Sequence, residues 1–350
     1  MSKALLPKIS LITPSFNQGE YIEETILSVI NQQYPNFEYI IIDGGSTDAT
    51  IDIIHKYTSH ITYWISEPDK GQSDAINKGF KVATGDIINW LNSDDCLAPG
   101  ALHKVAESFA QSAITAVTTG VQNFEENGVR WNEITPVKKS AVEYLGKVLN
   151  NQPGTYFKKE EWNKYFPIPA QLHYVMDQYL WFCYWLNNKA DNFKTNEQVT
   201  VYFRRHAQSK TNLSLKSELF RQMGKSFFNE YNLLFWSYFN AIDKQKAGVI
   251  ECYFDKDYTY RQKELKFPVA GDPPSADILF NTYLFELLKE DYRCGYLDRL
   301  ISNIPYLNKT LLNADDANAF KKMRRAKLSK AMLKTYRAIY WKVKGLGRHN

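Results

Sequence analysis

The sequence predicts an α/β fold, in which helices flank a mixed but mostly parallel sheet and a helical extension follows at the C-terminal end. From residue 8 to about residue 90, short apolar runs alternate with segments of helical periodicity, as in βα units that form a parallel sheet. Beyond about residue 209 the sequence turns helical and rich in aromatics. The 350 residues are 44% hydrophobic, which is enough for a large core.

The expected elements follow one another in βα order. Apolar runs bounded by Pro, Asn and Gly indicate strands, and apolar residues that share one helical face indicate helices. The expected strands are 9–13, a run that ends at Asp43, 61–66 and 86–91, and the expected helices are 21–31, 50–57 and 73–82. Less regular sequence follows, with a helix after Gly100, a strand at 113–124 and an aromatic helix at 176–186.

Polar and acidic residues follow the ends of several predicted strands. Asp43 precedes Gly44 and Gly45, and the strand at 86–91 is followed by the segment NSDD, residues 92–95. Ligands of open α/β sheets bind at the carboxyl ends of the strands, so we expect the functional site there. Neither GxGxxG in the first βα turn nor GxxxxGK[ST] anywhere is present, which excludes the usual dinucleotide and P-loop fingerprints.

The paired acids Asp94 and Asp95 need a compensating positive charge, because adjacent carboxylates repel each other. A divalent cation, Mn²⁺ or Mg²⁺, satisfies this need, since such ions bind a few carboxylate oxygens together with water and phosphate oxygens. The alternative is a solvated turn that caps the next helix. Asp43 has a similar alternative, a tight turn before a helix that Asp48 caps.

The charge is unevenly distributed. Of 43 Lys and Arg residues, eleven lie in 321–350, which contains none of the 38 acidic residues, so the rest of the chain is net acidic. From Leu328 this tail is amphipathic, which is typical of helices on anionic membranes. A helix docked on the body and a disordered end are the alternatives. We expect no nucleic-acid partner.

Cysteine usage and hydropathy predict a cytoplasmic protein, with the tail as a peripheral contact to the inner face of the membrane. The four cysteines form no CxxC pair and no dense framework. No stretch reaches eighteen uninterrupted apolar residues, and the first residues lack the apolar run of a signal peptide.

Three segments together resemble the inverting glycosyltransferases of family 2. They are ITPSFNQGEYIEETILSVINQQYPNFEYIIIDGGSTDAT, WISEPDKGQSDAINKGF and ATGDIINWLNSDD. The resemblance is strong over about residues 8–102, weaker to about residue 211, and absent from the remainder. It implies a GT-A (Rossmann-like) catalytic domain that binds a nucleotide-diphosphate sugar.

The resemblance implies a set of donor-site residues. Asp43 corresponds to the acid that contacts the base, although Gly44 replaces the second acid of the family's DDGS segment, and Asp74 falls where relatives have an Arg near the nucleotide. Asp95 corresponds to the direct metal ligand and Asp94 to a ribose or metal contact. The implied nucleotide-binding residues are Pro14, Ser15, Phe16, Asn17, Asp43, Asp74, Asn92, Ser93 and Asp94, and the implied metal ligands are Asp95, Asp94 and His206.

The resemblance also implies a general base, Asp177, in the segment HYVMDQYLW, where an acid opens a helix. An inverting transfer needs such a base to deprotonate the acceptor hydroxyl, and the N-terminal end of a helix stabilises a carboxylate. The alternative is an ordinary N-cap. Gln152, Pro153 and Thr155 resemble the segment that shapes the acceptor side of the pocket. For His206, a basic solvated turn is the alternative to metal binding.

The predicted organisation has three parts: a GT-A domain at 1–210, a helical region at 211–320 and the basic tail at 321–350. In the first part, 1–98 binds the donor and 99–210 the acceptor. The predicted function is an inverting, metal-assisted transfer from a nucleotide sugar, with UDP favoured, to a glycan or lipid-linked acceptor in polysaccharide biosynthesis. The alternatives are a membrane or nucleic-acid binding module that uses the tail, and a metal-dependent nucleotide-sugar phosphohydrolase.

Overall fold

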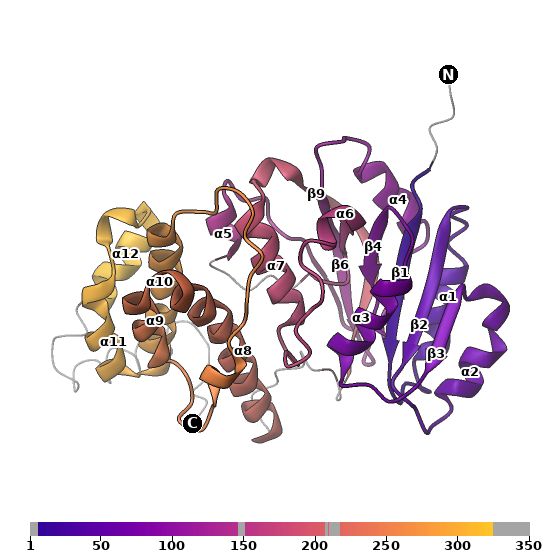
Figure 1. Cartoon of the computed structure of the whole chain (residues 1–350), viewed down its shortest axis with the longest axis horizontal. Coiled ribbons are helices and arrows are strands. Elements are labelled where there is room, and N and C mark those ends of the chain that lie inside the picture. The colour runs from indigo at the N-terminus through magenta and orange to yellow at the C-terminus, as the bar shows by residue number, and fades with distance from the viewer. Residues whose placement is uncertain (1–5, 146–150, 207–208, 210–217, 325–350) are drawn as a thin grey trace.

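A computed structural model describes residues 6–145, 151–206, 209 and 218–324. Figure 1 shows a twisted sheet with helices on both of its faces, and a group of helices from the C-terminal half that packs beside it. The predicted fold class is therefore confirmed: the molecule is an α/β protein with a mixed, mostly parallel sheet and a helical C-terminal region.

The sheet contains nine strands in the order β3-β2-β1-β4-β8-β6-β9-β5, with β7 paired to β6. The strands are β1 Ile9–Ser15, β2 Phe37–Asp43, β3 Tyr63–Ser66, β4 Ile87–Trp90, β5 Cys96–Leu97, β6 Ala116–Glu125, β7 Arg130–Glu133, β8 Thr155–Lys158 and β9 Phe193–Arg205.

The first four strands are the predicted ones, and they pair in parallel. β1 lies between β2 and β4, and β2 pairs with β3, so the residues that follow β1, β2 and β4 meet at one edge of the sheet. β3 begins two residues later than the expected start at residue 61, after a turn of 3-10 helix at Thr58–His60. All seven residues of β1 are buried, as expected for a strand covered on both faces.

The second half of the sheet departs from the simple βα repeat. β8 runs antiparallel between β4 and β6, and β9 runs parallel to β6 but antiparallel to β5. The sequence predicted only β6 here, together with a strand-like run before Arg204. β5 has two residues and β8 has four, too few for a periodic pattern to indicate them.

Helices cover both faces of the sheet and form the C-terminal region. They are α1 Ile22–Ile30, α2 Thr50–Lys56, α3 Gln72–Val82, α4 Ala101–Ser108, α5 Ala141–Leu145, α6 Lys159–Trp162, α7 Met176–Asn187, α8 Glu218–Ile242, α9 Lys244–Glu251, α10 Ala276–Cys294, α11 Leu297–Asn303 and α12 Ala314–Arg324.

Two apolar cores hold these layers together. One fills the face covered by α1, α2 and α4. The other starts under α3 and continues through α7 into α8 and α10, so the C-terminal helices share a core with the sheet. Gly79 lets α3 lie close to the sheet, because a Cβ there would stand 2.5 Å from Cγ2 of Ile12.

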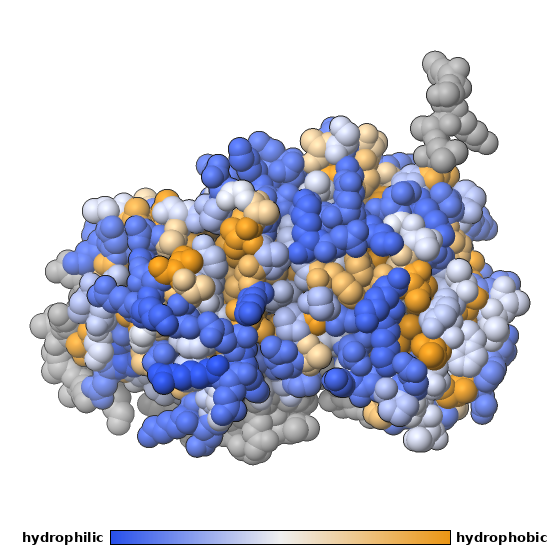
Figure 2. All heavy atoms as spheres, viewed as in Figure 1, coloured by the Kyte–Doolittle hydropathy of each residue, from blue (hydrophilic) through white to orange (hydrophobic). Residues whose placement is uncertain are grey.

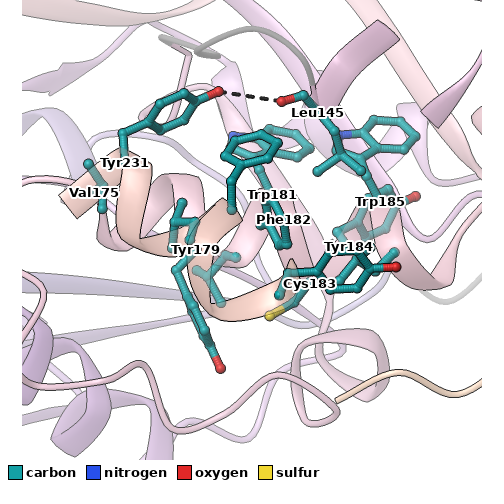
Figure 3. Close-up of a cluster of buried hydrophobic side chains, with 14 of the residues drawn as sticks. Leu145, Val175, Tyr179, Trp181, Phe182, Cys183, Tyr184, Trp185 and Tyr231 are labelled. Carbon is teal, nitrogen blue, oxygen red and sulfur yellow. Dashed lines mark hydrogen bonds between the residues drawn. The ribbon is translucent and has the colours of Figure 1, made fainter. Parts of the chain in front are cut away.

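Helix α7 is the centre of the second core. Apart from Asp177 and its last residue, Asn187, every residue of α7 is buried, and its rings pack against other aromatics, stacked for Trp185 on Tyr144 and edge-on for Phe182 against Phe235. Figure 3 shows this cluster, with Tyr231 of α8 donating a hydrogen bond to the carbonyl of Leu145, and the aromatic side chains of α7 pointing in several directions. The predicted aromatic helix is thus an internal helix rather than an amphipathic surface one.

The face of the molecule seen in Figure 2 is mostly hydrophilic. In the face shown in Figure 2, hydrophobic residues gather only in small patches between hydrophilic ones. Within the described ranges, none of the helices has the length and apolar character needed to span a bilayer. The predicted amphipathic tail falls almost wholly in 325–350, outside the described residues.

Candidate functional site

The NSDD segment follows β4 and is held by β9. Asp95 is fully buried: its Oδ1 accepts a hydrogen bond from the backbone N–H of Arg204 at 3.0 Å, and its Oδ2 accepts one from Asn92 Nδ2 at 3.2 Å. Burial, and then the neighbouring Asp94 carboxylate, raise the pKa of Asp95 well above its ordinary value. Ser93 is also buried. Both carboxylate oxygens of Asp95 thus accept hydrogen bonds from the protein itself.

Asp94 is the accessible member of the pair. About a fifth of its side chain is exposed, and its Oδ2 lies 3.0 Å from Nε2 of His206. The side chain of Arg204 donates to the backbone carbonyl of Asp94 at 3.1 Å, which fixes the loop. The structure thus brings the predicted ligands Asp94 and His206 into contact, while the geometry favours Asp94 over Asp95 as the carboxylate that a cation can reach.

These groups fit a divalent cation only in part. Among the described residues, no cluster of three or more His, Cys, Asp or Glu side chains is arranged to hold a metal ion. One carboxylate and one imidazole nevertheless suit an ion that takes its remaining ligands from water and substrate phosphate. The Asp94 carboxylate is the second cause of the raised pKa of Asp95, after burial, so a cation at this loop would reduce the repulsion between the two acids.

The loop after β2 is organised by Asp43, which is fully buried. Its Oδ2 accepts from the backbone N–H groups of Gly45 and Ser46 at 3.0 and 2.8 Å and from Ser66 Oγ at 2.7 Å, and its Oδ1 accepts from Ser46 Oγ at 2.5 Å. Oδ2 thus accepts three hydrogen bonds and Oδ1 accepts one, so this carboxylate organises the turn, and its contact with the base stays a prediction.

The segment after β1 supports the same loop. Asn17 adopts a left-handed conformation with φ of 52°; its N–H donates to Ser46 Oγ at 2.7 Å, and its Oδ1 accepts from the N–H of Thr47 at 2.9 Å. Ser15 is buried, with no hydrogen-bond partner for its Oγ among the described residues. Pro14 is buried as well, whereas Phe16 is 59% exposed. An exposed aromatic ring therefore stands at the strand ends.

The N-terminal turn of α3 joins the two halves of the site. Gln72 Nε2 donates to Asn92 Oδ1 at 2.8 Å, and Ser73 Oγ donates to the carbonyl of Leu172 at 2.7 Å, just before α7. Asp74, the predicted donor-site residue, accepts from the N–H of Lys70 at 3.1 Å and lies 3.8 Å from Lys78 Nζ. Its carboxylate holds the preceding loop.

Asp177 lies in the first turn of α7 and remains partly exposed on a helix that is otherwise almost wholly buried. Burial raises the pKa of Asp177 to about 6, although a hydrogen bond from Gln178 Nε2 at 3.0 Å acts in the opposite direction. Asp177 borders a small cavity together with Gln152, Thr155 and Trp181. A carboxylate with this pKa can take up a proton near neutral pH.

Glu230 of α8 caps the helix that carries Asp177. It is 4% exposed, and its Oε2 accepts from the backbone N–H groups of His173, Tyr174 and Val175 at 3.0, 2.8 and 3.3 Å. A carboxylate from the C-terminal region thus satisfies three backbone donors at and just before the N-cap residue of α7, Val175. No local sequence pattern indicates this contact, because Glu230 is more than 50 residues distant.

A sheet of this topology, with an accessible acid after a central strand and a partly buried acid across α3, defines a GT-A-like transferase site. Comparisons support that class. Residues 10–171 match the profile of Glycosyl transferase family 2. An uncharacterized glycosyltransferase of Haemophilus influenzae is 27% identical over 256 residues, covering 71% of this chain and 93% of that protein.

Two further comparisons agree. TuaG of Bacillus subtilis, named provisionally as a teichuronic acid biosynthesis glycosyltransferase, is 35% identical over 127 residues, which span 35% of this chain and 50% of TuaG. The crystal structure of S. aureus TarS 1-349 in complex with UDP-GlcNAc has a TM-score of 0.58 at 15% identity, covering 98% of this chain and 93% of that one. The chain is thus similar to the glycosyltransferases of family 2 over residues 10–171 and to the Haemophilus influenzae glycosyltransferase over 71% of its length.

Proposed function

We propose that this chain is an inverting transferase that moves a sugar from a UDP-sugar to a glycan or lipid-linked acceptor in polysaccharide biosynthesis. The observation that carries the proposal is Asp177, an acid with a pKa of about 6 on the first turn of a buried helix. UDP is favoured because the similar fold of TarS was solved with UDP-GlcNAc, and a polysaccharide product because TuaG is named for one.

In this reaction Asp177 accepts the proton of the acceptor hydroxyl while that oxygen attacks the anomeric carbon. The bond from this carbon to the diphosphate oxygen breaks at the same time, so the configuration inverts and the nucleoside diphosphate leaves with the bonding electron pair. The position of Asp177 at a helix N-terminus stabilises its charged form before the proton arrives.

The loop at residues 92–95, which carries Asp94 and Asp95, is the proposed binding site of the donor diphosphate. Asp94 and His206 would hold a divalent cation, and when bound this cation supplies positive charge to the leaving diphosphate. Arg204 and Asn92 keep the loop in place from two sides, while Gln72 ties it to α3. We propose that residues 1–98 bind the donor and residues 99–210 bind the acceptor. Residues 211–320 form the helical region.

The test is a panel of nucleoside diphosphates and nucleotide sugars in a thermal-shift assay with and without Mn²⁺, followed by acceptor-dependent release of the diphosphate. UDP and a UDP-sugar should raise the melting temperature, since a ligand that binds only the native state stabilises it. Release of UDP that needs no acceptor would instead favour the phosphohydrolase.

A peripheral membrane location through 321–350 predicts vesicle binding that is lost on truncation at Lys321.

A further inference from the structure

A cleft of about 580 Å³ opens in the C-terminal helical region, apart from the proposed active site. It lies where α9 and α10 begin, beside two 3-10 turns at Ile304–Tyr306 and Lys309–Leu311. Its lining residues all fall between 243 and 311, and none of them borders the small cavity at Asp177. Figure 1 shows α9 and α10 at the opposite end of the molecule from β3. Donor binding and proton transfer therefore do not account for this cleft.

Three large apolar side chains line the cleft although they are exposed: Ile278, Tyr306 and Leu311. Tyr306 is the most exposed of the three, at 48%. Exposed apolar residues that are scattered singly need no explanation, whereas a group of them around one hollow is typical of a binding site. The buried residues Val249 and Phe280 complete the apolar lining. The cleft thus offers one exposed aromatic ring and several aliphatic groups to a ligand.

The charges of the lining residues disfavour an anionic ligand. The one basic residue among them, Lys246, forms ion pairs with Asp243 and, at 2.9 Å, with Asp277. Two carboxylates against one ammonium give the lining a net charge of −1, so a phosphate or an anionic lipid headgroup would be repelled. Amide and hydroxyl groups, which both donate and accept hydrogen bonds, belong to the other polar lining residues: Gln245, Ser275, Asn281 and Asn308.

Hydrogen bonds hold the walls of the cleft in position. The buried Asn281 accepts a hydrogen bond at its Oδ1 from the backbone N–H of Asn308 at 2.7 Å. The Oδ1 of Asn308 in turn accepts from the N–H of Thr310 at 3.1 Å and from its Oγ1 at 2.8 Å, which fixes this turn. On the other wall, Asp243 caps α9 by accepting from the N–H of Gln245 at 3.1 Å. A preformed cleft binds a ligand at a lower entropic cost than one that must first be ordered.

A neutral sugar chain matches this combination of groups. A pyranose ring has an apolar face of C–H groups, which packs on an aromatic ring, and an edge of hydroxyls, each of which donates and accepts hydrogen bonds. Tyr306 can contact the face, while the exposed side chains of Asp277 and Gln245 can bond the hydroxyls. The volume of the cleft falls within the range of about 300 to 1,000 Å³ that is typical of small-ligand sites. A short oligosaccharide therefore suits the cleft in chemistry and in size.

We propose that this cleft binds a neutral oligosaccharide segment of the acceptor glycan, away from Asp177. It holds a long acceptor on the enzyme while the end of that acceptor occupies the active site, so affinity rises with acceptor length. This inference rests on the proposed function for its ligand class, a glycan acceptor. It adds a second glycan contact in the helical region at 211–320, to which the proposed function assigns no role.

Direct binding tests the cleft without turnover. Saturation-transfer NMR and titration calorimetry on the full chain, without nucleotide, would use three uncharged probes: cellotetraose, maltotetraose and chitotetraose. At least one of them should bind. Tyr306→Ala should weaken that binding about 2- to 10-fold, as for loss of an aromatic contact, whereas Tyr306→Phe keeps the ring and should bind as wild type. Asp277→Ala should weaken it about 10- to 100-fold, as for loss of a hydrogen bond to a charged group.

Two exposed residues of the same region that lie outside the cleft provide matched controls. Tyr296→Ala and Asp315→Ala should both bind the probes as wild type does. Failure of all three probes to bind, or binding that survives both Tyr306→Ala and Asp277→Ala, would overturn the proposal. Tighter binding of an anionic hyaluronan tetrasaccharide than of the neutral probes would overturn it as well.

Acceptor length gives a second readout, with a donor that supports transfer. Tyr306→Ala and Asp277→Ala should raise KM for a tetrasaccharide acceptor by the factors given above, while kcat and the KM for a monosaccharide acceptor stay as in wild type. Equal effects on both acceptors would contradict a remote site. Binding of a neutral probe that depends on Tyr306, in a chain that releases no UDP with any acceptor, would support the cleft and reject the proposed function.

Discussion

The proposed donor side, residues 1–98, and the proposed acceptor side, residues 99–210, are built in different ways. On the donor side, short loops at the strand ends hold one another, as when Asp43 bonds Ser46 and Asn17 bonds Thr47. On the acceptor side, Asp177 sits on a helix that is buried among C-terminal elements and capped by Glu230. Donor binding should therefore depend on local loops, whereas catalysis should also depend on contacts across the whole chain.

Among the changes that test this comparison, removal of the proposed base should have the largest effect, which is on kcat. Asp177→Asn keeps the shape of the side chain but cannot take a proton, so kcat should fall about 10²- to 10⁴-fold. The dissociation constant of UDP should stay unchanged, because the donor loops are intact. Asp52→Asn, another acid in the first turn of a helix, is the matched control. Normal turnover by the Asp177 variant would exclude it as the base.

The next largest effect should distinguish the two acids after β4, Asp94 and Asp95. Asp94→Asn removes the accessible carboxylate, and we expect Mn²⁺-dependent UDP binding to need about 10- to 100-fold more metal, as for loss of a group that supports a metal site. Asp95→Asn should mainly lower the melting temperature, because Asp95 is buried and bonded to Arg204. Metal titrations that show the larger effect for the Asp95 variant would restore the division expected from the sequence.

Glu230 tests whether the C-terminal region acts on the chemistry. Glu230→Gln weakens the cap of the helix that carries Asp177, so we expect kcat to fall about tenfold through a small displacement of the base. UDP affinity should not change. Glu264→Gln, an exposed acid of the same region, serves as control. A loss of melting temperature with normal kcat would show that the cap is only structural.

The smallest expected effect is in the pH dependence of kcat/KM and of stability. Burial raises the pKa of Asp177 from 3.8 to about 6, and the base must be deprotonated to act. The value of kcat/KM should therefore rise with pH, about tenfold per unit below pH 6, and level off above it. The folded state binds this proton more tightly than the unfolded state, so the same group lowers stability as pH rises from about 4 to about 6. Asp177→Asn should lack that slope.

The sequence predicted the donor side better than the acceptor side, for a physical reason. The strands before Asp43 and Asn92 are apolar runs of regular spacing, and such local patterns are visible without a structure. Asp95 is buried and Asp94 is partly exposed because the backbone N–H of Arg204 in β9 bonds Asp95, a contact that no local pattern indicates. The hydrogen bonds of Glu230 with residues 173–175 likewise join separate segments, and the nucleotide and metal contacts stay predictions.

The burial of α7 has a consequence during synthesis on the ribosome. Its aromatic residues pack against Phe235 and share a core with Tyr283 and Leu288, which are translated up to roughly a hundred residues later. At a synthesis rate of about 5 to 20 residues per second, α7 is made about 5 to 20 s before the residues that it packs against. The nascent chain should therefore need a chaperone over that interval, and a message truncated before α10 should yield an aggregating product rather than a smaller enzyme.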